Sequence, residues 1–258
     1  MLCMNDPEIL RDLHVHTTFS DGKASPEEMV RRALAIGMDC IGFSDHSHSP
    51  QPGGDSWSMP LHRRDEYRQE IARLKKAYAG KIEILCGAEQ DLYSDAPTDG
   101  FDYLLGAMHF IRVPGEDRFF SVDWTADNLR RAAEEGFGGD PYALCEAYYE
   151  QLSALPDVLP NCFAIAHFDL ISVFQEQSPL FDENHPRYVA AWQRAADTLL
   201  KMRIPFEINT GAISRGYRTT PYPSAAMREY IRSRGGTFIL ASDSHRPETL
   251  CYGFETWG

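Results

Sequence analysis

Short apolar runs alternate along the chain with segments whose apolar residues follow helical spacing. The first run covers Ile9 to Val15, and residues 25–28 (Ser-Pro-Glu-Glu) then supply an N-cap, a proline at the first helical position and a capping-box glutamate. The helix is predicted to end at Gly37, before a second strand from Cys40 to Phe43. The chain therefore opens with the strand, helix and strand of a βαβ unit.

The same alternation continues to the end of the chain. Helical spacing recurs over residues 67–78, 144–155, 189–199 and 224–234, and strand-like runs over 82–86, 103–107, 162–166, 205–208 and 237–241. The segment 112–140 is polar, contains glycine and shows no clean strand, so we interpret it as an excursion over one rim. About seven strands interleaved with helices predict a parallel α/β sheet, closed as a barrel, in a single domain.

Composition is that of a soluble globular protein, with 43% hydrophobic and 24% charged residues and no apolar stretch of membrane-spanning length. The charges are 25 basic and 38 acidic, giving a net charge of −13. Long nucleic acids are therefore disfavoured as partners, whereas a small phosphate ester is not, because bound metal cations would invert the local charge. The N-terminus shows no basic segment followed by a long apolar run, which predicts a cytoplasmic protein.

The six cysteines are scattered and form no CxxC pair, so neither a zinc ribbon nor a dithiol redox site is indicated. We interpret them as reduced thiols.

Side chains that can bind metals follow almost every predicted strand. They are His14 and His16 after the first strand, Asp45 and His46 after the second, Glu89, His109 and His167 after the next three, and Asp243 and His245 after the last. The carboxyl ends of parallel strands in an α/β barrel meet on one face, so these residues are expected to share a pocket.

Each residue alone has an ordinary explanation, since a histidine at a strand end is more often structural and an aspartate there often caps a helix. Six of the nine histidines in this position are harder to explain in that way. A buried group of imidazoles and carboxylates is costly to desolvate unless cations pair with it, which favours a metal site. Imidazole with carboxylate suits zinc, iron, manganese or nickel.

Residue spacing supports this interpretation. The two-residue period of a strand points His14 and His16 to one face, and it aligns Asp243 with His245 in the same way. Glu89 follows two small residues, and a lone carboxylate among histidines can bridge two ions. Bridged ions would share a hydroxide and stabilise an anionic transition state.

Several short motifs of the sequence resemble those of a known family. Residues 12–22 (DLHVHTTFSDG) and 42–46 (GFSDH) are similar to the opening motifs of the PHP (polymerase and histidinol phosphatase) superfamily. Later segments resemble its histidinol-phosphatase branch, namely 87–89 (GAE), 106–110 (GAMHF), 166–169 (AHFD), 207–210 (EINT) and 242–248 (SDSHRPE). The resemblance implies a distorted (β/α)7 barrel, a PHP-type phosphoesterase domain over residues 1–258, and three divalent metal ions of zinc, iron or manganese.

Carried over by position, the resemblance also implies three ligand sets. The first ion would bind His14, His16, Glu89 and Asp243, the second would share Glu89 and take His109 and His167, and the third would bind Asp21, His46 and His245. Asp45 would either orient a ligand imidazole or cap a turn, and the sequence leaves both readings open.

Substrate contacts are expected outside the metal ligands. Residues 209–216 resemble the family segment that carries a phosphate-binding basic residue, and we select Arg215, with Arg218 second, although either could be a solvated loop charge. The placing of residues 211 and 212 departs from the family pattern, which leaves the register of that arginine open. His48 could contact substrate, and Trp57 could stack on an imidazole if its loop folds over the pocket.

The resulting hypothesis is a metal-dependent phosphate monoester hydrolase, specifically a histidinol-phosphate phosphatase, in which Glu89, His14, Asp243 and Arg215 act in catalysis. A hydroxide between the two Glu89-bridged ions would attack phosphorus in line, while the third ion and Arg215 neutralise the phosphoryl oxygens. A PHP-type phosphoesterase or nuclease acting on nucleotides is the alternative. An amidohydrolase would also begin with His-x-His, but no lysine stands at a middle strand end, and an inactive metal-binding module is the remaining possibility.

Overall fold

Seven parallel strands form one sheet within residues 9–258, the part of the chain that the computed structural model describes. Their order in the sheet is β1-β2-β3-β4-β7-β8-β9. They are β1 (Arg11–Asp12), β2 (Cys40–Phe43), β3 (Glu83–Asp91), β4 (Tyr103–Ala107), β7 (Ala164–Ile165), β8 (Phe206–Asn209) and β9 (Phe238–Ala241). Each strand therefore follows its neighbour in sequence, as expected of a barrel built from βα units.

The first and last strands are joined at the carboxyl end of the sheet. Val15, beyond β1, forms a parallel bridge with Ser244, beyond β9. The backbone N–H of His16 donates to the carbonyl of Ser244 at 2.8 Å, and the N–H of Ser244 donates to the carbonyl of His14 at 3.1 Å. This bridge closes the ring beside the candidate ligands, and the prediction of a distorted seven-stranded barrel is confirmed.

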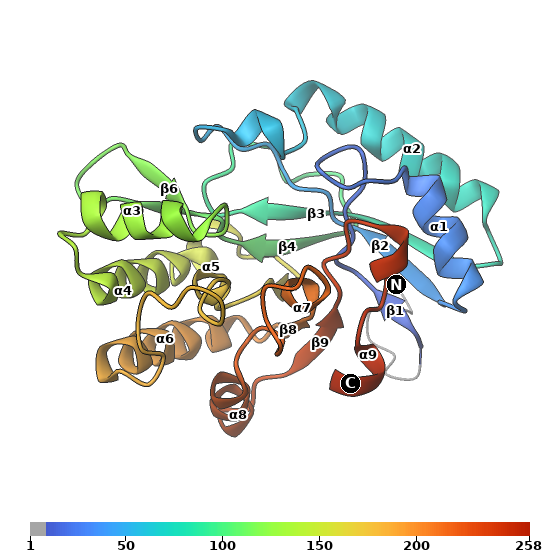
Figure 1. The fold of residues 1–258 in the computed structure, drawn as a ribbon. Helices are drawn as coiled ribbons and strands as arrows, with labels where there is room; N and C mark the ends of the chain where they lie inside the picture. Colours follow the sequence, from blue (N-terminus) through green and yellow to red (C-terminus); the bar gives the residue numbers. More distant parts are fainter. Residues whose placement is uncertain (1–8) are drawn as a thin grey trace.

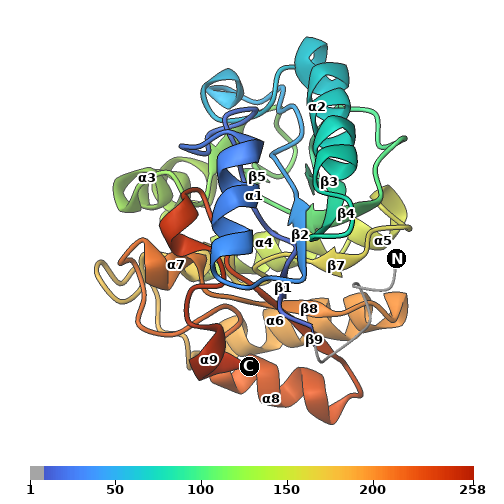
Figure 2. The same cartoon turned by 90° about the vertical axis from the view of Figure 1, so that its right-hand side faces the viewer.

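Helices surround this sheet (Figures 1 and 2). They are α1 (Pro26–Ala35), α2 (Arg64–Ala77), α3 (Ala126–Gly136), α4 (Pro141–Leu152), α5 (Leu155–Val158), α6 (Pro186–Leu199), α7 (Gly211–Ser214), α8 (Ala225–Ser233) and α9 (Phe254–Trp257). Short 3-10 turns are η1 (Gly54–Ser56), η2 (Leu61–Arg63), η3 (Leu170–Ser172), η4 (Leu200–Met202) and η5 (Pro247–Thr249). The start of α1 is as predicted, since Ser25 and Glu28 form the capping box.

The apolar faces of the helices pack on the outside of the sheet. Met29 and Val30 of α1 and Ile71 of α2 are fully buried, in the same cluster as Ile41 of β2 and Ile84 of β3. At the lower left of Figure 1, α4 and α6 pack against each other. This packing holds the strands in place, so the positions of the side chains at the strand ends are set by the barrel.

The excursion between β4 and β7 is more regular than its sequence predicts. It contains a two-stranded antiparallel hairpin of β5 (Phe110–Arg112) and β6 (Phe119–Ser121), followed by helix α3 with Thr125 as its N-cap. The prediction that residues 112–140 hold no clean strand is therefore wrong. Strands of three residues are too short to show the alternation by which strands are recognised in a sequence.

The prediction of reduced thiols is confirmed for four cysteines and wrong for one. Cys86, Cys145, Cys162 and Cys251 are free, whereas Cys40 is disulfide-bonded. Cys3 lies outside the described residues. Disulfide partners need to be neighbours in space and not in sequence, so the absence of a CxxC pair did not exclude this bond.

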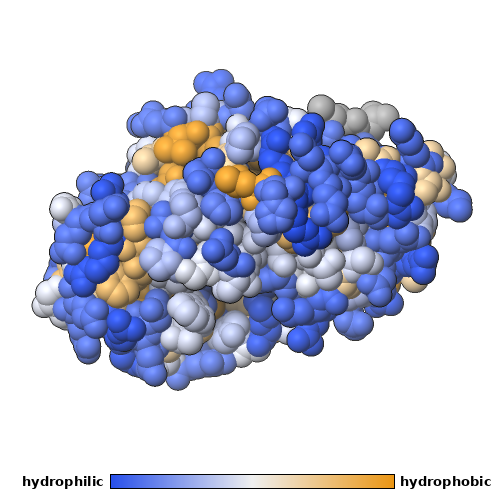
Figure 3. Space-filling view, turned by 90° about the horizontal axis from the view of Figure 1, so that it is seen from above, coloured by the Kyte–Doolittle hydropathy of each residue, from blue (hydrophilic) through white to orange (hydrophobic). Residues whose placement is uncertain are grey.

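Across residues 9–258, no helix is both long and apolar enough to cross a membrane. The face in Figure 3 is mainly hydrophilic, and its hydrophobic residues lie in small separate areas.

Candidate metal centre

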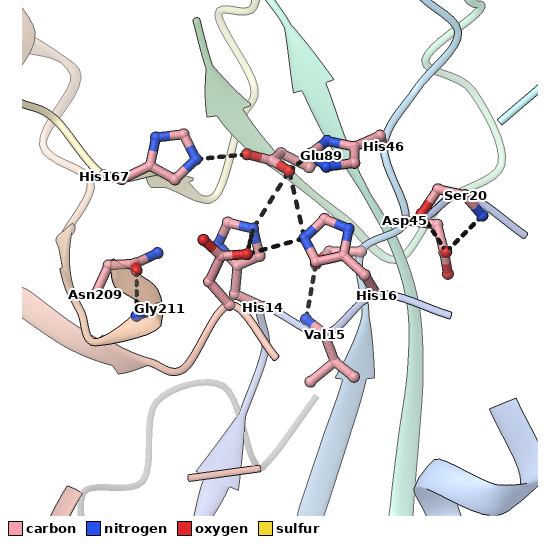
Figure 4. A network of polar contacts seen from close by, with 12 residues as sticks. His14, Val15, His16, Ser20, Asp45, His46, Glu89, His167, Asn209 and Gly211 are labelled. Carbon is pink, nitrogen blue, oxygen red and sulfur yellow. Dashed lines mark hydrogen bonds and ion pairs between the residues drawn. The ribbon is translucent and has the colours of Figure 1, made fainter. Parts of the chain in front are cut away.

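The nine residues predicted as metal ligands meet at the carboxyl end of the barrel. They are His14 and His16 after β1, Asp21 in the loop that follows, His46 after β2, Glu89 in β3, His109 after β4, His167 after β7, and Asp243 and His245 after β9. Seven of them are buried, and Asp21 and His245 are partly exposed. Figure 4 shows four of the imidazoles gathered around the Glu89 carboxylate.

Glu89 lies at the centre of this group. Its Oε1 is 2.7 Å from His167 Nε2 and 3.3 Å from His109 Nε2. Its Oε2 is 2.8 Å from His46 Nδ1 and 3.3 Å from His14 Nε2. Because each oxygen faces a different pair of imidazoles, the carboxylate has the placement needed to bridge two cations.

Asp243 and Asp21 extend the group on either side of His16. Asp243 Oδ1 is 3.3 Å from His16 Nε2, and Asp21 Oδ1 is 3.1 Å from His245 Nε2. The imidazoles of His16 and His245 stack with centroids 4.1 Å apart. Asp243 adopts φ of +50°, a backbone conformation that is rare for a residue other than glycine and often occurs at functional sites.

Several polar atoms of this group are buried without a hydrogen-bond partner in the described residues. They include His14 Nε2, both ring nitrogens of His16, and Asp21 Oδ1. Buried polar atoms left unpaired are rare in proteins and costly, and divalent cations would satisfy these. The residues present therefore fit a metal centre made of nitrogen and oxygen donors.

The ligand atoms fall into four overlapping groups in which all atoms lie within 4.8 Å of one another. The groups are His16-Asp21-His46-His245, His14-His16-Glu89, His46-Glu89-His109 and His14-His167-Asp243. The first contains the whole of the third ligand set implied by the resemblance, and the second contains most of the first set. Each of the last two groups joins residues that the resemblance assigned to two different ions.

The electrostatics of the cluster favour the metal-binding form for Glu89 and His16. Burial acts to raise the pKa of the Glu89 carboxyl, but the surrounding imidazoles, His46 and His14 foremost, outweigh it and hold that pKa well below its usual range. Burial lowers the pKa of His16 well below its usual value, and the neighbouring imidazoles of His245 and His46 add to this effect. Glu89 is therefore an anion and His16 a neutral imidazole. For His14, His46 and His109, burial acts to lower the pKa, but the neighbouring carboxylates outweigh it and raise that pKa, so each of these imidazoles would release a proton when a cation binds.

Two further carboxylates, which the sequence analysis did not select, hold the ligand imidazoles in place. Glu207 Oε1 is 2.8 Å from His14 Nδ1, and Asp91 Oδ2 is 3.1 Å from His109 Nδ1. Each contact directs the opposite nitrogen, Nε2, towards Glu89. Asp91 could have been found from its spacing, because it follows Glu89 by two residues on the same strand. Glu207 could have been found as the charged residue of β8, where it stands between Phe206 and Ile208.

We expect Glu207→Gln to weaken metal binding about 10- to 100-fold, because the amide is neutral and can turn its NH₂ group towards His14 Nδ1. Metal affinity would be measured by competition with a chromophoric chelator. The matched control is Glu229→Gln on α8, an exposed position away from the cluster, which should bind metal as the wild type does. An unchanged affinity in Glu207→Gln would show that this carboxylate does not orient the ligand.

Asp45 stabilises the loop that carries Asp21. Its carboxylate accepts hydrogen bonds from the backbone N–H and hydroxyl of Thr17, both at 2.8 Å, and from the backbone N–H of Ser20 at 3.0 Å and its hydroxyl at 2.6 Å. In Figure 4 it points away from the imidazoles. The sequence left two roles open for Asp45, and the structure shows that it caps a turn and does not orient a ligand imidazole.

A cavity of about 580 Å³ opens in front of the cluster, and Arg215 lies in its wall. The guanidinium donates from Nη2 to Asp243 Oδ2 at 2.9 Å and from Nη1 to the Asp243 carbonyl at 3.1 Å. A Cβ on Gly211 would lie 2.8 Å from both Arg215 Nη2 and the Asp243 carboxylate, so only glycine fits there. Lys23 and Arg246 also line the cavity, and the sequence analysis missed both.

The structure does not place Arg218 or His48 in this cavity. The chain turns at Gly216, where φ is +76°, and the Arg218 side chain is buried beside Ser172, with Nη1 3.8 Å from Asp169 Oδ2. His48 Nδ1 instead contacts Asp95 Oδ1 at 2.5 Å. Neither side chain is thus positioned for the substrate contact expected of it.

A closed parallel barrel with buried imidazoles and carboxylates at its carboxyl rim is the architecture of metal-dependent α/β-barrel enzymes. The family model of the PHP domain matches residues 12–211, and the chain belongs to this family. Asp243 and His245 lie beyond the matched range but complete the same cluster.

Individual relatives agree with this assignment. A Deinococcus radiodurans protein named "Probable histidinol-phosphatase" is 28% identical over 95% of this chain and 90% of its own length. A structure described as a candidate histidinol phosphatase from Listeria monocytogenes superimposes with a TM-score of 0.81 at 20% identity, over 96% of this chain and all of the other. Histidinol phosphate phosphatase from Lactococcus lactis, solved with zinc, L-histidinol and phosphate, gives a TM-score of 0.68 at 22% identity, over 92% and 87%.

Proposed function

We propose that this protein is a metal-dependent phosphate monoester hydrolase that converts L-histidinol phosphate and water into L-histidinol and phosphate. The observation that carries the proposal is the convergence of ligand side chains from most of the strand ends on one cavity, whose wall also holds Arg215, Lys23 and Arg246. Cations beside a metal cluster suit a phosphate group. The names of the relatives, and the L-histidinol and phosphate bound to the Lactococcus lactis enzyme, support the choice of substrate.

The proposed centre holds three divalent ions of zinc, iron or manganese. We assign the sets His14-His16-Glu89-Asp243, Glu89-His109-His167 and Asp21-His46-His245 to them. Bound there, such cations would supply a hydroxide at neutral pH and positive charge for the phosphoryl oxygens. All of the donors are nitrogen or oxygen atoms, which favours these metals over a thiolate-bound structural zinc.

The side chains around the centre have separate tasks. Glu89 would hold two of the ions, while Glu207 and Asp91 hold the rings of His14 and His109 in the orientation required. Arg215 is fixed by Asp243 and faces the cavity, where it can neutralise phosphoryl oxygens as charge builds up in the transition state. Strand β9 continues the barrel beyond the matched residues, so we propose one PHP-type domain over residues 1–258.

We expect Arg215→Lys to lower kcat for histidinol phosphate about 100-fold, because an ammonium cannot hold Asp243 at two atoms and contact a phosphate oxygen at the same time. Steady-state kinetics at a fixed metal content would measure it. Arg203→Lys, at an exposed turn outside the cavity, is the control and should leave kcat unchanged. A kcat for Arg215→Lys equal to that of the wild type would remove Arg215 from the proposed mechanism.

The proposed function is tested by measuring phosphate release from a panel of monoesters with protein of known metal content. The panel contains L-histidinol phosphate, nucleoside monophosphates and simple sugar phosphates. We expect kcat/KM to be highest for L-histidinol phosphate. Preference for a nucleotide would favour the alternative phosphoesterase, and bound metal without any phosphate release would indicate an inactive binding module. A cytoplasmic location stays a prediction, which cell fractionation would test.

A further inference from the structure

A second, smaller lobe of the cleft adjoins the candidate metal centre. It has a volume of about 250 Å³ and shares Asp21, His46, His109 and Asp123 with the larger cavity. Its remaining wall comes from the η1 loop and from the β5–β6 hairpin, including the residues that follow it. A small molecule can therefore reach from one lobe into the other past the metal centre.

The two lobes differ in charge. The larger lobe is lined by three basic residues, Lys23, Arg215 and Arg246, as well as by Asp21, Asp123 and Asp243. The described lining of the smaller lobe contains the carboxylates of Asp21 and Asp123 but neither lysine nor arginine, so all the basic side chains lie at one end of the cleft. Asp123 Oδ1 accepts a hydrogen bond from Ser121 Oγ at 2.9 Å. Within residues 9–258, Asp123 has no ion pair with a basic side chain that would neutralise it. The cleft is therefore suited to a molecule with an anionic end and a cationic end.

Aromatic rings form much of the smaller lobe. Trp57 lies edge-on to the His46 ring, with centroids 4.7 Å apart, and stacks on Phe110 at 6.0 Å. Trp124 is 70% exposed, and its backbone N–H donates to Ser121 Oγ at 3.1 Å, the hydroxyl that also contacts Asp123. Indole faces attract flat heteroaromatic rings and organic cations, and a large indole left in solvent at the mouth of a pocket is suited to covering a ligand.

We infer that the smaller lobe binds the leaving-group end of the substrate, and that Asp123, Trp57 and Trp124 select an alcohol carrying both a positively charged amine and a flat ring. The inference rests on the proposed function, because it places the phosphate in the larger lobe beside Arg215. Asp123 pairs with the amine, and the indoles contact the ring. Simple sugar phosphates lack both groups, and the base of a nucleotide carries no positively charged amine at neutral pH.

The role of Asp123 is tested with Asp123→Asn and two esters. One is L-histidinol phosphate, and the other is the phosphate of 3-(imidazol-4-yl)propanol, which has the same ring without the amine. We expect the ratio of their kcat/KM values to fall about 10- to 100-fold in Asp123→Asn, because only the first ester loses a charged hydrogen bond. Asp117→Asn removes the same charge from the exposed turn of the same hairpin and should leave the ratio unchanged.

The role of the indole is tested with Trp124→Ala, which should leave the packing intact because the side chain is mostly in solvent. We expect KM to rise about tenfold for L-histidinol phosphate, and by less for the phosphate of 2-aminopropanol, which has the amine without the ring. An equal rise in KM for both esters would contradict the assigned contact between the ring and the indole.

Binding of L-histidinol, measured by calorimetry with the metal-loaded proteins, separates this inference from the proposed function. If the wild type hydrolyses L-histidinol phosphate but Asp123→Asn changes neither the ratio nor L-histidinol affinity, the subsite is wrong and the function stands. If the wild type releases no phosphate but binds L-histidinol in a manner that depends on Asp123, the function is wrong and the subsite stands. Absence of L-histidinol binding to the wild type overturns the subsite.

Discussion

Replacing Glu89 with glutamine is expected to lower kcat/KM for histidinol phosphate by about 10³-fold or more, with little change in fold. Each oxygen of this carboxylate lies within 3.3 Å of two imidazole nitrogens, so both are placed to contact cations. Glutamine has nearly the same shape but only one oxygen and no charge. It therefore cannot bridge two ions, and the proposed pair would lose its shared ligand.

The experiment compares Glu89→Gln with Glu134→Gln, an exposed position on α3 that undergoes the same chemical change outside the cavity. Metal content, circular dichroism and kcat/KM are measured for both variants and for the wild type. We expect the first variant to bind fewer ions per chain with a native spectrum, and the second to match the wild type in all three. Full activity in Glu89→Gln would refute the central role of this residue.

The sequence was sufficient for the parts of the site that depend on backbone period. The pairing of His14 and His16 on one face follows from the two-residue repeat of a strand, and the parallel sheet brings His109 and His167 to the same rim as Glu89. These positions are set by the barrel itself. Local sequence pattern and fold agree there, which is why the candidate cluster could be assembled before the structure was known.

The parts that could not be predicted depend on how loops turn in space. Arg215 and Arg218 are three residues apart in one loop, yet the turn at Gly216 sends one into the cavity and buries the other beside Ser172. Nothing in the local pattern distinguishes them, because both are single basic residues among polar neighbours. Asp123 joins the cleft only because a short hairpin folds over the rim.

The contacts of the buried carboxylates could not be predicted from the sequence either. Asp45 precedes a ligand histidine, which made an orienting role plausible, but its oxygens are occupied by Thr17 and Ser20. The orienting role falls instead to Glu207, which is 193 residues from His14 in sequence. A hydrogen bond between such distant residues depends on the register of two strands, and single-sequence reasoning does not supply that register.

Removing the metal ions is expected to abolish phosphate release and to lower Tm by about 10 °C. An ion present at about a thousand times its Kd stabilises the folded state by about 4 kcal/mol, and in a domain of this size 1 kcal/mol corresponds to about 2–4 °C. Without cations, the buried nitrogen atoms of His16 and the Asp21 oxygen lose their proposed partners. Differential scanning calorimetry before and after exhaustive chelation measures the change in Tm. The decrease in Tm on chelation should be smaller for Glu89→Gln than for the wild type.

Re-addition of single metals then distinguishes the ions. Zinc, manganese or iron should restore both activity and Tm, because imidazole is a good ligand for each of them. Magnesium should restore neither, since it prefers oxygen donors and keeps most of its water, whereas six of the nine candidate ligands are histidines. Activity that survives chelation while metal analysis finds no ion would refute the metal centre, and recovery with magnesium alone would contradict the assigned imidazole ligands.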